Sequence, residues 1–157
     1  MKTIAKLELK QSRVRVPNVS ALGENFDCPD RVAEIARLLI GDSAQEVVIA
    51  FMLNVKNNVS GYVEVARGGV DHCAIDMRQV FRAAVSVSAA AIILAHNHPA
   101  GDPKPSREDH DITKRVAECG ELLGIVLLDH VIVTDSKSYS FAADGILPSR
   151  NIRRSHG

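Results

Sequence analysis

The sequence lacks several features that would assign it to a special class of protein. No apolar run approaches the roughly 18 residues that a membrane-spanning helix needs, and residues 1–10 alternate lysine with apolar side chains instead of building a signal core. The three cysteines are widely spaced and include no C-x-x-C pair, which argues against a disulfide framework. The 19 basic and 19 acidic side chains cancel, so no overall field attracts nucleic acid or an anionic membrane. We therefore expect a cytoplasmic protein that does not bind membranes.

The composition that remains is that of an ordinary globular domain. The chain has 157 residues, of which 46% are hydrophobic and 24% charged, and this is enough to bury a core. It contains no internal repeat, low-complexity segment or evident linker. We expect one domain, in which residues 1–45 supply an N-terminal strand and a packing helix, residues 46–147 form the core and residues 148–157 form a loose basic tail.

Runs of mostly apolar residues predict strands that are buried on both faces, at residues 46–53, 89–95 and 125–133. The first run follows a single glutamate, and two polar residues interrupt the third. Asn57 and Asn58 predict a turn that joins the first of these to a strand at residues 62–66. Alternating apolar residues indicate a half-buried strand at residues 2–10, and a short last strand is expected within residues 136–145. Together these segments predict a mixed sheet of about five or six strands.

Apolar residues at helical spacing predict three helices that pack on the sheet, at residues 29–40, at residues 76–85 and after Ser106. Pro29 suits the first position of the first helix, and Gly41 suits its end. The second helix opens at Asp76 with the D-x-x-Q pattern of a capping box, and its predicted buried face includes Val85. The third should end near one of the two glycines at positions 120 and 124. The predicted fold class is α/β, with a mixed sheet flanked by helices.

The stretch from His96 to Asp109 reads H-N-H-P-A-G-D-P-K-P-S-R-E-D and contains the strongest chemical signal. His96 and His98 are two apart at the end of a predicted strand, so their side chains project together while Asn97 faces away. Proline and glycine at residues 99–105 force a rigid loop, after which Asp109 falls in the first turn of a helix. Two imidazoles and one carboxylate around an open fourth position form the ligand set of a catalytic zinc ion.

Simpler interpretations exist for each part of this stretch. Two histidines near the end of a strand can simply be solvated. The S-x-x-D spacing of Ser106 and Asp109 also resembles a capping box, which satisfies the free amide groups at the start of a helix. The ordered combination of H-x-H, seven residues, a serine, two residues and an aspartate favours a metal site over coincidence.

The spacing H-x-H-x7-S-x2-D resembles the signature of JAMM (MPN) metalloproteases, and the fuller stretch resembles the RadC branch of that family. The similarity extends over residues 46–145 and includes the L-L-D-H sequence at residues 127–130. Ala100 stands where RadC-like proteins usually carry serine, which removes no ligand. We expect a short form without the helix-hairpin-helix segment that precedes this domain in longer RadC proteins, and this weakens the case for DNA binding.

The resemblance implies a cytidine-deaminase-like JAMM/MPN architecture and a zinc ion held by His96, His98 and Asp109. It implies a metalloprotease that hydrolyses a peptide or isopeptide bond in a peptide or protein substrate. Deaminase chemistry is not implied, because the H-x-E and P-C-x-x-C signature of zinc deaminases is absent. Two alternatives stay open: an accessory protein associated with DNA repair or recombination, and a non-catalytic binding domain that a metal ion stabilises.

Further polar residues are candidates for roles around the metal. In JAMM proteins a glutamate at a helix-to-strand junction acts as general base; Glu46 matches it best, with Glu64 as the competitor. From its position alone, Glu46 could reach a central site or lie at the surface. Ser106 would donate a hydrogen bond to the tetrahedral oxyanion. Asp129 and His130 interrupt a buried strand, where they either orient a ligand imidazole from behind or occupy a bulge or sheet edge.

Overall fold

The computed structural model describes residues 10, 12, 26, 28–68 and 75–147. The strand predicted at residues 2–10 lies outside these residues except for Lys10, and the predicted basic tail lies outside them entirely. Within the described part, no helix combines the length and the apolar character that a bilayer span requires.

The described chain forms three helices and a five-stranded sheet. In chain order the elements are α1 (Pro29–Ile40), β1 (Val47–Leu53), β2 (Val59–Arg67), α2 (Met77–Ser86), β3 (Ala91–Asn97), α3 (Arg107–Leu123), β4 (Val126–Val133) and β5 (Ser138–Ser140). The strand order is β2-β1-β3-β4-β5, in which β3 and β4 are parallel and the other neighbours are antiparallel. The prediction of a single α/β domain with a mixed sheet is confirmed.

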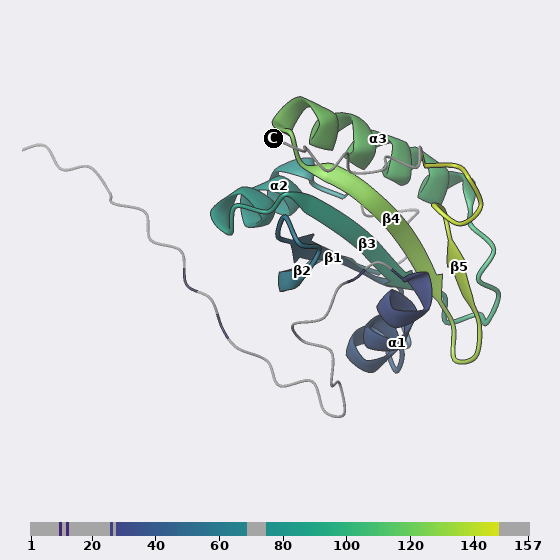
Figure 1. Cartoon of the computed structure of the whole chain (residues 1–157). Coiled ribbons are helices and arrows are strands. Elements are labelled where there is room, and N and C mark those ends of the chain that lie inside the picture. The colour runs from purple at the N-terminus through teal and green to yellow at the C-terminus, as the bar shows by residue number, and fades with distance from the viewer. Residues whose placement is uncertain (1–9, 11, 13–25, 27, 69–74, 148–157) are drawn as a thin grey trace, which may run out of the picture.

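The sheet lies between two helical layers, with α1 on one face and α2 and α3 on the other (Figure 1). Every residue of β1 and β3 is buried, which is why these two central strands read as continuous apolar runs. Along β3, Ile92 and Leu94 pack toward α2 and α3, whereas Ile93 and Ala95 pack toward α1. The same alternation sends His96 toward α3 and Asn97 toward α1.

The β3 strand begins and ends two residues later than predicted. It starts at Ala91, because Ser88 adopts a left-handed conformation with φ of 53° and turns the chain out of α2. It continues through Asn97, so His96 lies inside the strand and is only 1% exposed. The β2 strand is likewise longer than its predicted core of residues 62–66.

Two details of α2 differ from the prediction. Asp76 accepts a hydrogen bond from the backbone N–H of Arg78, but the side chain of Gln79 donates to the carbonyl oxygen of Glu64, so the capping box is incomplete. Val85 is 58% exposed, since it lies about 100° around the helix from the buried Ala84.

The ends of the other two helices follow local sequence. The α1 helix begins at Pro29 and is followed by Gly41, as predicted. The α3 helix ends at Gly124, whose φ of 70° suits glycine, and Gly120 lies inside the helix. A Cβ atom at Gly120 would collide with the carbonyl oxygen of Ile125, so this position serves close packing and does not end the helix.

Candidate metal centre

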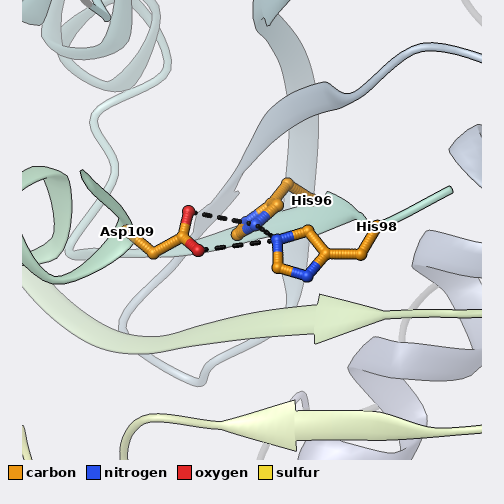
Figure 2. A group of neighbouring side chains, drawn as sticks. All are labelled: His96, His98 and Asp109. Carbon is orange, nitrogen blue, oxygen red and sulfur yellow. Dashed lines mark hydrogen bonds and ion pairs between the residues drawn. The ribbon is translucent and has the colours of Figure 1, made fainter. Parts of the chain in front are cut away.

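Three polar side chains converge where β3 ends beside the first turn of α3. The Nε2 atoms of His96 and His98 are 2.8 Å apart. Asp109 places one carboxylate oxygen 3.2 Å from Nε2 of His96 and the other 3.5 Å from Nε2 of His98 (Figure 2). All three potential ligand atoms lie within 4.8 Å of one another, so this group could hold a metal ion. The structure thus brings together the three residues proposed as ligands from the sequence.

Asp109 is oriented by the start of its own helix. The backbone N–H of Ser106 donates to Oδ2 of Asp109 at 2.7 Å, and the backbone N–H of Asp109 donates to Oγ of Ser106 at 3.1 Å. These two bonds form a complete capping box. The capping interpretation and the metal-site interpretation are therefore compatible, because the box holds the carboxylate where both of its oxygens face a histidine.

His98 is held by the loop that follows it. Its backbone N–H donates to the carbonyl oxygen of Val133, and its Nδ1 atom lies 2.8 Å from the carbonyl oxygen of Asp102. A carbonyl oxygen can only accept, so Nδ1 of His98 bears the hydrogen. In the neutral ring the other nitrogen, Nε2, then presents its lone pair.

His96 is held by a chain of buried side chains. Its Nδ1 atom lies 2.8 Å from Nε2 of His130, whose Nδ1 lies 2.6 Å from Oγ1 of Thr113. The Thr113 hydroxyl donates its only hydrogen to the carbonyl oxygen of Asp109 at 2.6 Å. His130 must therefore donate from Nδ1 to Thr113, and its neutral ring accepts from Nδ1 of His96. This leaves Nε2 of His96 with a lone pair that faces the other two candidate ligands.

The electrostatics of the site favour a positive ion. Burial raises the pKa of Asp109, but the bonds with His96 and His98 outweigh it and hold this pKa well below its usual range. The bond to Asp109 raises the pKa of His98, whereas burial lowers the pKa of His130 well below its usual value and keeps that ring neutral. Two imidazole lone pairs and a carboxylate repel one another unless a proton or a metal cation lies between them. The donor set therefore fits a metal ion.

The structure places the two candidate general bases differently. Glu46 directly precedes β1, two residues before Val48, which pairs with His96 in the sheet. The negative charge of Glu46 makes a contribution to the raised pKa of His98 that is smaller than that of the bond to Asp109. Glu64 is exposed on β2 and forms a bidentate ion pair with Arg67 at 2.7 and 2.8 Å. The Arg67 guanidinium lowers the pKa of Glu64.

Ser106 has its hydroxyl group beside Asp109. Its Oγ accepts a hydrogen bond from the backbone of Asp109, so that bond does not use the hydroxyl hydrogen. The hydroxyl hydrogen therefore remains available for a bond to another acceptor.

Asp129 and His130, the two polar residues within β4, have different partners in the structure. His130 contacts His96, whereas the Asp129 carboxylate accepts from Ser140 Oγ at 2.6 Å and from the backbone N–H of Ala142 at 3.0 Å. Because adjacent residues on a strand face opposite sides of the sheet, the sequence already indicates that only one of the two can contact the candidate ligands. Thr113 was not identified from the sequence, although its position one helical turn after Asp109 places it on the same face of α3.

Comparison with known proteins agrees with this geometry. Residues 26–146 match the model of the RadC-like JAB domain family. A UPF0758 protein of Carboxydothermus hydrogenoformans is 44% identical over 143 residues, which cover 91% of this chain and 62% of that protein. UPF0758 proteins of Trichlorobacter lovleyi and Clostridium perfringens are each 43% identical, over 79% and 73% of this chain and 54% and 52% of their own lengths. The chain thus spans between 52% and 62% of these relatives. It belongs to the family of RadC-like JAB domain proteins.

Proposed function

We propose that this protein is a zinc-dependent hydrolase that cleaves a peptide or isopeptide bond with a metal-activated water. The observation that carries the proposal is the convergence of His96, His98 and Asp109, whose lone pairs face one another. Membership of the RadC-like JAB family supports it. Two imidazole nitrogens and one carboxylate oxygen are a set of protein ligands found in catalytic zinc sites, which keep a fourth position open.

His96, His98 and Asp109 would hold the zinc ion, which would supply a Lewis acid and would lower the pKa of a water molecule to about 7. The protein residues supply the proton transfers. Glu46, which directly precedes β1 and lies two residues before the partner of His96 in the sheet, accepts the proton of the attacking water and passes it to the leaving amine. The Ser106 hydroxyl, which keeps its hydrogen in the capping box, donates to the oxyanion that forms on the scissile carbonyl.

The first test is zinc analysis of the full chain purified without metal-affinity resin, with His98→Ala as the matched variant. We expect about one zinc per chain in the wild type and its loss in the variant, because three protein ligands are needed. No metal in the wild type, even after zinc is supplied, would end the hydrolase proposal.

The second test is turnover of a library of peptide and isopeptide substrates. Glu46→Gln should keep zinc and lose turnover, because the amide retains the size of the side chain but cannot accept the proton. Full activity in Glu46→Gln would transfer the role of general base to Glu64 or refute the mechanism. Zinc binding without any hydrolysis would favour a metal-stabilised binding domain, and DNA binding that weakens steeply with salt would favour a DNA-associated role.

A further inference from the structure

His130 and Thr113 lie behind the candidate metal site, and neither of them is a candidate ligand. The relay of hydrogen bonds runs from His96 on β3 through His130 on β4 to Thr113 on α3, and its distances are 2.8 and 2.6 Å. It closes on the carbonyl oxygen of Asp109, which supplies the third candidate ligand. The relay therefore joins the two elements that carry the candidate ligands.

The relay is rigid because it is enclosed. His96 and His130 are each 1% exposed, and Thr113 is 2% exposed. The ring of His130 stacks on Phe141 with centroids 4.9 Å apart and planes 10° from parallel. His130 pairs across the parallel strands with Leu94, which lies two residues before His96 on the same face of β3. The two histidine rings lie side by side, with centroids 4.8 Å apart. Neither ring can rotate without disturbing the core.

We propose that His130 and Thr113 are positioning residues that hold His96 in the tautomer whose Nε2 atom binds the metal. The inference rests on the proposed metal site. A chain of two neutral imidazoles has two self-consistent states. In one, both Nδ1 atoms carry hydrogen and Nε2 of His96 has a lone pair; in the other, both Nε2 atoms carry hydrogen and His96 cannot bind a metal through Nε2.

Thr113 selects between these two states. Its hydroxyl hydrogen is committed to the carbonyl oxygen of Asp109, so its oxygen can only accept from Nδ1 of His130. Only the state in which Nε2 of His96 is unprotonated satisfies this requirement. His130 contributes no charge of its own, whereas a buried carboxylate in its place would add a negative charge that requires compensation. The negative charge of the candidate ligand set therefore comes from Asp109.

The test measures zinc affinity by competition with a chelator of known affinity, using the full chain. His130→Phe keeps an aromatic ring beside Phe141 but removes the acceptor for His96, and zinc should bind about 10- to 100-fold more weakly. Thr113→Val keeps the shape and removes the hydroxyl, so affinity should also fall. Thr113→Ser restores the hydroxyl and should restore affinity.

Val131→Ala is the matched control on the same strand. It removes a buried apolar side chain that packs toward α1, on the face of the sheet opposite His130, so it destabilises the fold without touching the relay. Its zinc affinity should equal that of the wild type when measured well below its unfolding temperature. A loss of affinity in His130→Phe that Val131→Ala does not share then reports positioning of the ligand.

A second measurement reads the tautomers directly. In the metal-free wild type labelled with ¹⁵N-histidine, His130 should show a protonated Nδ1 and an unprotonated Nε2, with slow exchange of the buried N–H. Thr113→Val should show mixed or reversed protonation of that ring, and Thr113→Ser should resemble the wild type. A general loss of packing would not reverse a tautomer.

The outcomes separate the relay from the hydrolase. Wild-type affinity in both His130→Phe and Thr113→Val overturns the relay and leaves the hydrolase standing. Weakened zinc binding in both variants, with no hydrolysis by the wild type, supports the relay and removes the hydrolase. A wild-type protein that binds no zinc overturns both proposals.

Discussion

The side-chain oxygen of Asn97 accepts a hydrogen bond of 2.7 Å from the backbone N–H of Val47. The amide nitrogen of the same side chain donates to the carbonyl oxygens of Ser43 and Gln45, both at 3.1 Å. One buried side chain at the end of β3 therefore holds the backbone on both sides of Glu46. Because Asn97 and His96 face opposite sides of the sheet, β3 can position a metal ligand and the proposed general base at once.

Asn97→Ala should lower stability and turnover without weakening zinc binding. The loss leaves the buried N–H of Val47 without its acceptor, and we expect the free energy of unfolding to fall by about 1–3 kcal/mol. Turnover should fall because the segment around Glu46 is no longer held, whereas zinc affinity should stay near the wild-type value. Urea unfolding and chelator competition measure the two effects. Ser43→Ala, which removes only two local and exposed bonds with the backbone of Gln45, is the control and should change stability by less than about 0.5 kcal/mol.

Gly120→Ala should destabilise α3 although alanine favours helices. The added methyl group would collide with the carbonyl oxygen of Ile125, and backbone cannot move aside as a flexible side chain can. We expect a loss of about 1–3 kcal/mol in chemical denaturation. Glu118→Ala on the exposed face of the same helix breaks only a 3.9 Å pair with Lys114 and should change stability little. Equal stability of the two variants would contradict the packing role of Gly120.

Tyr139 should remain protonated to unusually high pH. Partial burial, followed by the hydrogen bond to the Asp144 carboxylate at 2.5 Å, raises the pKa of Tyr139 to about 12. Since this pKa lies above the value of about 10 in an unfolded chain, the interaction stabilises the fold below about pH 10, and this contribution is lost as the pH rises toward 12. Subtracting the alkaline absorbance titration of Tyr139→Phe from that of the wild type should give a midpoint near 12.

Asp144→Asn is the complementary variant for this titration. It keeps a hydrogen-bond acceptor but removes the negative charge, so the midpoint of Tyr139 should move down toward about 10. A difference titration whose midpoint is already near that value in the wild type would show that the Tyr139 contact is not formed in solution.

The candidate ligands could be predicted from the sequence because their arrangement depends on short-range geometry. His96 and His98 are related by the two-residue period of a strand, and Asp109 is placed by the first turn of a helix. The proline-rich loop between them is short enough to return the chain over the strand end. The sheet was predictable for a similar reason, since β1 and β3 are buried on both faces and read as continuous apolar runs.

The remaining features depend on tertiary packing. Alternation along β4 shows that Asp129 and His130 face opposite ways, but not which of them faces α3. Thr113 contacts His130 only because α3 packs against β4 beside that histidine. Likewise, the D-x-x-Q pattern at Asp76 predicts a reciprocal cap, whereas the side chain of Gln79 donates to the carbonyl oxygen of Glu64 on β2, 15 residues earlier. Local sequence cannot rank partners that only folding brings together.

Ser106 has two roles that a single substitution can separate. Glycine is a good residue at the N-terminal cap of a helix, so Ser106→Gly should reduce the stability of α3 by only a few tenths of a kcal/mol. The same change removes the hydroxyl hydrogen that we assign to the oxyanion, and kcat should fall by about 10²- to 10³-fold. Zinc content should be retained, because the backbone N–H that donates to Asp109 at 2.7 Å survives the substitution.

The contrast with Ser106→Thr makes the result decisive. Threonine keeps both the capping oxygen and the hydroxyl hydrogen, so this variant should preserve stability and a large part of the turnover. If Ser106→Gly instead retained full turnover, the hydroxyl would serve only as a cap. The oxyanion would then depend on the metal and on other donors. If both variants lost zinc, Ser106 would act through the position of Asp109, because the capping box is what aims that carboxylate at the two histidines.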